Sequence, residues 1–345
     1  MSDTRKLHLF GRKLPLAPPP STLPDWQQAN PLWITQALKR SQTLPQSGWT
    51  VVDASRVLRD VPRRYRLNGR DWVAWRTPQG PRLAPDACPH MGASLANGRV
   101  CGEDLICAWH GLRLGAQPHG TWRPVPTFDD GVLFWAALDP ERPRHEPVVL
   151  SQRPARFFDA VIRKPARCAP ADVIANRLDP WHGVHYHPYA FGRLRVLERD
   201  DDAIFVRVVY RTFGRYGIEV DARFSCPDPT TIVMRIERGE GAGSLVETHV
   251  AAIDAEHTAI VEATLATSDR PGFWWVVRGL GGLLLRPLVR KVAMRLWVDD
   301  AAYAERLAYL RREADALKSE SPNRPLTDAR VSEKPALDDC PSSPG

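Results

Sequence analysis

The stretch that decides the fold lies between residues 88 and 112 and reads Cys88-Pro-His-Met-Gly-Ala-Ser-Leu-Ala-Asn-Gly-Arg-Val-Cys-Gly-Glu-Asp-Leu-Ile-Cys-Ala-Trp-His-Gly-Leu112. It contains a Cys-x-His pair and a Cys-x2-His pair, separated by positions 91–106. Thiolates and imidazoles in two matched pairs are typical of a metal centre. A zinc site made of two cysteines and two histidines is the alternative, but its usual order keeps like ligands together, which is not the order here.

Residues 49–138, which contain both pairs, resemble the Rieske domain of ring-hydroxylating and related oxygenases. The resemblance implies that the two cysteines hold one iron of a [2Fe–2S] cluster and that the two histidines hold the other. The implied cluster ligands are Cys88, His90, Cys107 and His110. Rieske proteins of cytochrome complexes carry a further cysteine in each loop, where this chain has Ala93 and Trp109. The resemblance therefore points to the oxygenase or ferredoxin branch.

The residues around these motifs favour a small β-domain over residues 48–150. Short apolar runs alternate with turn signals such as Asn68-Gly69, which is typical of antiparallel strands. The predicted runs are Trp72–Trp75, Leu105–Cys107 and Val132–Trp135. Residues 1–47 precede them as a proline-rich lead-in, with one short helix predicted at Pro31–Ser41.

A second domain is predicted over residues 156–317. Helices are expected at residues 171–181 and 299–317, with long β-type runs between them. Those runs cover residues 203–212, 218–225, 231–237, 245–253 and 259–267. Strands bracketed by helices predict an antiparallel sheet packed against helices, so the fold class is α+β. Residues 318–345 are rich in Ser, Pro, Asp and Glu and are predicted to form a disordered tail.

A second cluster of metal-binding residue types, Asp-Pro-Trp-His-Gly-Val-His-Tyr-His, occupies residues 179–187. Two histidines and a carboxylate on one face of a metal are common in O2-activating iron enzymes. The spacing of three predicts that Asp179 and His182 share a helix face. His182 and His187 are five apart and do not share a face of a straight helix, but a break at Pro180 and Gly183 would let both reach one metal. A group of surface or helix-capping histidines is the alternative from these residues alone.

Within the resemblance, this stretch matches the iron motif Asp-x2-His-x4-His of Rieske oxygenases at Asp179, His182 and His187. The match implies that both histidines bind a mononuclear iron. It also implies that Asp179 bridges one of them to a Rieske histidine of a neighbouring subunit. The histidine at position 185 falls outside the motif and is expected to be a spare polar residue in the pocket.

The third iron ligand implied by the resemblance is an aspartate on a C-terminal helix, five residues before a glutamate. Asp300 and Glu305 have this spacing, and Asp299 is the competing candidate. The resemblance covers roughly residues 48–315. It implies that a Rieske domain is followed by a catalytic domain of helix-grip type, an antiparallel sheet with a C-terminal helix.

The activity implied by the resemblance is an O2-dependent monooxygenase or dioxygenase with a [2Fe–2S] cluster, a mononuclear Fe(II) and O2 as co-substrate. NAD(P)H would supply electrons only through a separate reductase or ferredoxin, and a homotrimer is expected. Two alternatives remain from the residues. One is a Rieske electron carrier without a functional mononuclear iron, and the other is a zinc-stabilised binding protein.

Composition limits the partners and the location. The 345 residues suffice for two domains, and no run of 18 apolar residues predicts a membrane span. No secretory signal is recognised, so a cytoplasmic protein is expected. The net charge of +7 comes from scattered arginines, which does not favour nucleic acid. Residues 271–297 combine Trp, aliphatic residues and only positive charge, which suits the interface of an anionic membrane, here its inner face. The alternative is a pair of helices in the core that covers the pocket. The membrane interpretation predicts a small lipophilic substrate, such as an isoprenoid or carotenoid-like molecule.

Overall fold

The computed structural model describes residues 8–9, 12–13, 26–211 and 216–320, so the predicted tail beyond residue 320 lies outside the described residues. The chain divides into two compact units, Met1–Ala308 and Tyr309–Gly345. All the sites considered below belong to the first unit. Within the described residues, no helix has the length and apolar character needed to cross a membrane.

The N-terminal segment contains a small hairpin and a helix. The hairpin joins β1 (His8–Leu9) to β2 (Arg12–Lys13), and η1 (Trp26–Gln28) precedes α1 (Pro31–Ser41). The Asn30 side chain accepts a hydrogen bond from the Trp33 N–H at 3.0 Å, and Pro31 occupies the first helical position. A side-chain cap followed by proline is a strong start signal, and the helix has its predicted bounds.

The N-terminal β-domain consists of three antiparallel sheets of three strands each, ordered β4-β5-β6, β7-β8-β9 and β10-β11-β3. Their bounds are β3 Thr50–Ala54, β4 Arg63–Leu67, β5 Arg70–Thr77, β6 Gly80–Pro85, β7 Arg99–Cys101, β8 Asp104–Ile106, β9 Arg113–Leu114, β10 Thr127–Asp129 and β11 Leu133–Ala136. Single helical turns form η2 (Ser55–Val57) and η3 (Leu95–Asn97). Asn68 and Gly69 close the β4–β5 hairpin with φ of 50° and 73°, as a two-residue turn of this sequence requires.

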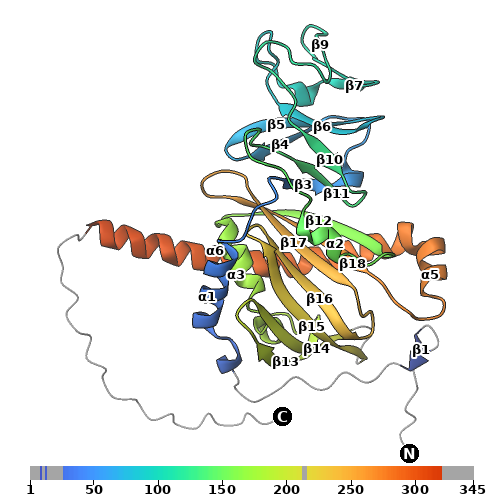
Figure 1. Ribbon diagram of the computed structural model, residues 1–345, viewed down its shortest axis with the longest axis vertical. Coiled ribbons are helices and arrows are strands. Elements are labelled where there is room, and N and C mark those ends of the chain that lie inside the picture. Colours follow the sequence, from blue (N-terminus) through green and yellow to red (C-terminus); the bar gives the residue numbers. More distant parts are fainter. Residues whose placement is uncertain (1–7, 10–11, 14–25, 212–215, 321–345) are drawn as a thin grey trace, which may run out of the picture. The chain divides into compact units, whose positions relative to one another are not determined.

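The second domain is built on one seven-stranded antiparallel sheet in the order β12-β18-β17-β16-β15-β14-β13 (Figure 1). The strand bounds are β12 Phe158–Ala166, β13 Phe191–Arg199, β14 Ala203–Arg211, β15 Gly217–Asp228, β16 Thr231–Gly239, β17 Leu245–Ala252 and β18 Thr258–Ala266. The five predicted runs form β14 to β18. The two strands not predicted, β12 and β13, are the two edges. Edge strands tolerate charged residues and proline, here Pro165 in β12, and so lose the apolar signal of a strand.

The two faces of this sheet pack against different parts of the first unit. On β12, Ile162 faces a core that also contains α1, α3 (Pro170–Arg177) and α6 (Arg286–Glu320). The adjacent Val161 faces the opposite way, into a core shared with Val51 and Trp135 of the β-domain. Successive strand residues point to opposite faces, so Val161 belongs to the apolar cluster that joins the two domains.

Three helical predictions need correction. The helix predicted at residues 171–181 is α3, which ends at Arg177. The junction of the two predicted domains, where no helix was expected, contains the short helix α2 (Val148–Gln152). The closing helix α6 begins at Arg286 instead of residue 299 and includes residues 318–320 of the predicted tail. It follows α5 (Phe273–Val276) and the π-helical segment η4 (Val277–Leu285), and Pro287 lies in its first turn, where a missing N–H is tolerated.

Candidate metal centres

The two Cys–His motifs form a matched pair of loops. In each loop the cysteine N–H, from Cys88 or Cys107, donates to the carbonyl five residues later, at 2.8 and 2.9 Å respectively. The glycine four residues after the cysteine donates back to the cysteine carbonyl, at 2.7 and 3.0 Å. These glycines, Gly92 and Gly111, have φ of 76° and 75°, a left-handed conformation that glycine adopts without strain.

The side chains of these loops converge. The Cys88 and Cys107 thiols are buried, unbridged and hydrogen-bonded to each other. His90 and His110 are exposed, with ring centroids 4.9 Å apart and planes at 80°. Two thiols inside and two imidazoles outside fit a [2Fe–2S] cluster whose histidine-bound iron lies at the surface.

Backbone donors favour the thiolate form that a metal ligand needs. Burial alone would raise the pKa of Cys107, but the N–H groups of Trp109 and His110 and the thiol of Cys88 lower that pKa overall. Thiolates bind metals and thiols do not, so this loop is suited to hold iron.

The second centre joins two segments far apart in sequence. After α3 the helical structure is interrupted around Pro180, and the short helix α4 (His182–Tyr186) follows. The Nε2 atoms of His182 and His187 lie 2.9 and 2.8 Å from the same carboxylate oxygen, Oδ1 of Asp300 on α6. One ligand atom from each residue lies within 4.8 Å of the other two. His187 and Asp300 are buried and His182 is nearly so, and the set fits the two-histidine, one-carboxylate site of a non-haem iron.

The charges at this centre reinforce one another. Burial alone would raise the pKa of Asp300, but hydrogen bonds with His182 and His187 lower it well below its usual range. Burial would lower the pKa of His182, but hydrogen bonds with Asp179 and Asp300 raise it to about 9. The Asp300 carboxylate is therefore kept in its charged form. A metal cation could displace the protons that this carboxylate shares with the two histidines.

Asp299, the competing candidate, faces the other side of His187. Its carboxylate lies 3.3 Å from the Nδ1 atom of that ring and accepts the Tyr189 hydroxyl at 2.7 Å. The Arg295 guanidinium lies 3.7 Å from the Tyr189 ring centroid. A carboxylate on the outer nitrogen of a metal-binding histidine fixes the tautomer and orientation of the ring. Asp299 is therefore placed to orient a ligand, while Asp300 faces both histidines.

Asp179 does not share a helix with His182 as predicted, because it lies in the break between α3 and α4. Its backbone carbonyl contacts Nδ1 of His182, and its carboxylate Oδ2 lies 3.8 Å from the same atom. The other oxygen, Oδ1, is buried and has no hydrogen-bond partner among the described residues. His185 is exposed and packs beside Trp181, so it is not a pocket residue.

Sequence reasoning missed two residues, one on α3 before the metal-binding segment and one packed on a proposed ligand. The side chain of Asn176 is fully buried, and neither its amide nitrogen nor its oxygen has a partner in the described part of the chain. The ring of Tyr303 stacks on His182 at 5.4 Å. Asn176 could have been noticed in the sequence as a polar residue on the apolar side of a predicted helix. No local sequence pattern marks Tyr303. Glu305 lies outside the centre, because it accepts the Arg167 N–H.

Comparisons with known proteins find matches for both domains. Residues 48–132 match the Rieske [2Fe–2S] domain, and residues 138–315 match a family described as a domain of unknown function, DUF5914. Aminopyrrolnitrin oxygenase PrnD of Pseudomonas fluorescens is 38% identical over 72 residues, 21% of this chain and 20% of that protein. The oxygenase component of 3-ketosteroid-9-alpha-monooxygenase of Rhodococcus rhodochrous is 24% identical over 211 residues, 54% of each chain.

The chain thus spans about a fifth of one curated relative and about half of the other. The crystal structure of dicamba monooxygenase bound to dicamba shares the fold, with a TM-score of 0.52 and 16% identity over 82% of this chain and 92% of that one. With the match over residues 138–315, this chain belongs to the DUF5914 family, and it carries a Rieske [2Fe–2S] domain before that match.

Proposed function

We propose that the protein is an O2-dependent oxygenase that hydroxylates, desaturates or demethylates an apolar substrate at a mononuclear iron. The observation that carries the proposal is the convergence of His182 and His187 on Asp300 in a chain that also has a Rieske domain. The bound cluster would supply single electrons, and the bound iron would supply O2 activation. A Rieske electron carrier, the alternative, has no use for the second centre.

The protein groups at the iron site would act as holders and orienters. His182, His187 and Asp300 would hold the iron, and a set of three protein ligands would leave positions for O2 and substrate. Asp299 holds the His187 ring by its outer nitrogen. The buried, unpartnered amide of Asn176 is available to hydrogen-bond a polar group of the substrate, since an unpaired buried amide is costly.

Electron delivery is proposed to cross between subunits of a homotrimer. The Oδ1 atom of Asp179 is buried and unpaired within the described chain, so it can accept a hydrogen bond from outside. His90 and His110 are exposed, and the neighbouring Met91 and Trp109 are 64% and 62% exposed. An apolar rim around two donor imidazoles is suited to dock on another protein surface. Asp179 would then join the imidazoles of the two centres.

The partner and substrate proposals follow from the same chemistry. Electrons would come from NAD(P)H through a separate reductase or ferredoxin. The substrate proposal is a small lipophilic molecule of isoprenoid or carotenoid type, supported by the steroid named for one relative. A peripheral contact with the inner face of a membrane through residues 271–297 would give such a substrate a route to the protein.

Metal analysis of anaerobically purified protein tests the function. The oxygenase requires about three irons and two acid-labile sulfides per chain, the sum of a [2Fe–2S] cluster and one further iron. It also requires that chemically reduced protein consume O2 when a lipophilic substrate is present. Two irons with two sulfides would establish the electron carrier instead, and zinc would establish the binding protein.

A further inference from the structure

The segment formed by α5, η4 and the first turns of α6 leaves large apolar side chains in water. Trp275 is 85% exposed and Leu283 is 83% exposed. On α6, Leu288 and Val292 are four apart and exposed on one stripe. The core stripe of the same helix, which contains Ala293 and Trp297, is buried against the sheet. The exposed stripe is therefore not the face by which α6 packs on the sheet. For Leu288 and Val292, the alternative of a helix pair in the core is excluded.

The charges within this segment are all positive. Residues 271–297 contain five cationic side chains and no carboxylate. Two of the five are engaged, since Arg286 pairs with Asp159 at 3.0 Å and Arg295 lies over the Tyr189 ring. The remaining three are exposed, and none of them pairs with a carboxylate of the described residues. These three are Arg278, Arg290 and Lys291.

A hollow of about 480 Å³ opens on the same face. Arg156, from the segment before β12, and Arg278 of η4 line it together with Trp274 and Trp275. The Arg156 guanidinium lies 4.0 Å from the Trp274 ring centroid, so the indole holds this cation at the hollow. Two guanidinium groups can bind a phosphate, and the indoles beside them suit the headgroup region of a bilayer.

We propose that this face docks on an anionic phospholipid bilayer and that the Arg156–Arg278 hollow receives a lipid headgroup phosphate. The inference deepens the membrane contact of the proposed function and does not depend on its oxidation chemistry. Leucines and tryptophan would enter the interface while the cations meet anionic headgroups. A second copy in a two-fold contact is a poorer occupant, because residues 271–297 carry only positive charge and would face themselves, and a contact with a different face of a second copy is distinguished by the sedimentation measurement below.

Flotation of the metal-loaded full chain with vesicles tests the proposal. Vesicles of phosphatidylcholine and phosphatidylglycerol at about 7:3 should bind the protein at low salt, and pure phosphatidylcholine should bind it weakly. Raising the salt to about 0.5 M should weaken binding by screening. Arg278→Glu with Arg290→Glu should weaken it by at least about thirtyfold, because each cation near an anionic surface contributes roughly fivefold in affinity. Trp275→Ala with Leu283→Ala should weaken it at constant charge.

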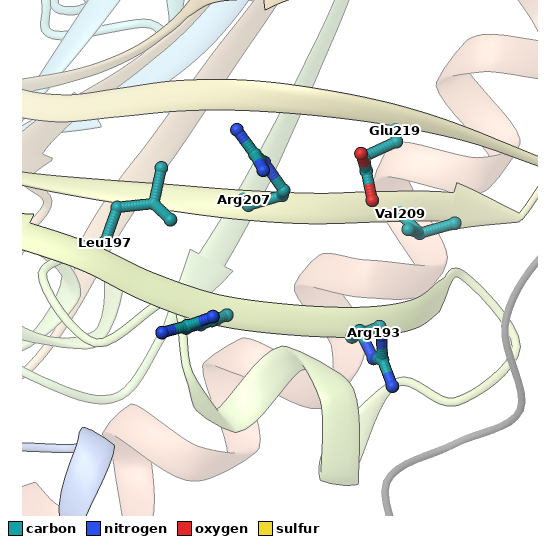
Figure 2. A pocket seen from close by; sticks show the side chains of 6 residues that line it. Arg193, Leu197, Arg207, Val209 and Glu219 are labelled. Carbon is teal, nitrogen blue, oxygen red and sulfur yellow. The ribbon is translucent and has the colours of Figure 1, made fainter.

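A matched control separates this face from general basic charge. Arg193 and Arg195 are exposed on β13 and line a different hollow with Arg207 and Glu219, seen in Figure 2. Arg193→Glu with Arg195→Glu makes the same charge change and should leave vesicle binding unchanged. If both charge-reversed double variants lost the same amount of vesicle binding, the binding would be non-specific attraction to basic charge and the proposed site would be ruled out.

Two further measurements complete the test. If wild-type protein ignores the anionic vesicles and Trp275→Ala with Leu283→Ala lowers its sedimentation coefficient, the face is a contact between copies and the proposal fails. Iron content and O2 consumption with a water-soluble substrate analogue should be unchanged in all these variants. Failure of lipid docking is thereby distinguished from failure of the oxygenase.

Discussion

The two metal centres are built in opposite ways. The cluster ligands lie in two neighbouring loops with the same hydrogen-bond pattern, and the two histidines are exposed. The iron ligands come from segments 118 residues apart, and two of the three are buried. The first centre depends on local backbone geometry, whereas the second depends on how α4 and α6 pack. A change at one centre should therefore leave the other intact.

The largest expected effect is the loss of the mononuclear iron in His187→Ala. Removing a buried ligand should lower iron from about three to about two atoms per chain and abolish substrate oxidation, because two ligands rarely hold this metal. The Rieske-type electron paramagnetic resonance signal of the reduced cluster should persist. His185→Ala is the matched control, since that exposed histidine is two residues away and should lose nothing. Loss of the cluster signal in His187→Ala would contradict the independence of the centres.

Asp179→Asn tests the only link proposed between the centres. The amide keeps the size and removes the charge, so both metals should load while single-turnover electron transfer from the pre-reduced cluster slows by about 10–100-fold. Asp299→Asn should instead weaken iron binding, because it loosens His187 without touching the link. A near-normal transfer rate in Asp179→Asn with full metal content would remove Asp179 from the electron path.

His110→Cys should change the cluster without changing the iron site. A third thiolate adds negative charge, so the reduction potential should fall by on the order of a few hundred millivolts, toward that of all-cysteine clusters. A redox titration followed by electron paramagnetic resonance measures the shift. Trp109→Phe, one residue earlier, should leave the potential nearly unchanged. A cluster that keeps its potential in His110→Cys would mean that this histidine is not a ligand.

The smallest expected effect concerns the matched loops themselves. Gly92→Ala places a Cβ atom where nothing lies within 4 Å, so the cost is only the left-handed backbone, about 1 kcal/mol of unfolding free energy. Gly111→Ala has the same open surroundings and should cost the same. Urea unfolding monitored by cluster absorbance gives both values. Unequal costs would show that the loops are alike in hydrogen bonds but not in stability.

The difference between the centres also explains what sequence could predict. Cys88, His90, Cys107 and His110 come together through loops whose glycines and spacing are visible in the chain, so local reasoning is sufficient. At the iron site, the resemblance to the Rieske oxygenase motifs identified three residues that converge, including Asp300. The prediction that Asp179 and His182 share a helix face was wrong. The helix α3 ends at Arg177, and α4 begins only after Pro180.

Other features of the catalytic domain arise only from packing. No pattern in residues 286–298 distinguishes a buried helix from an exposed one, and α6 is both, because Trp297 is buried and Leu288 is exposed. The edge strands β12 and β13 lack a strand signal because one side of each has no neighbouring strand. The position of Asp299 on the outer nitrogen of His187 also requires the folded helix.

If the exposed stripe docks on a bilayer as proposed, the continuity of α6 would set a length scale for substrate selection. Leu288, on the exposed stripe, and Asp300, at the iron site, are twelve residues apart on one helix, which is about 18 Å along its axis. This is close to the roughly 15 Å thickness of one hydrocarbon leaflet. With the stripe at a bilayer, an elongated lipophilic molecule can keep one end among the acyl chains while the other reaches the metal. The helix would then act as a molecular ruler that selects the oxidised carbon by its distance from the end of the substrate.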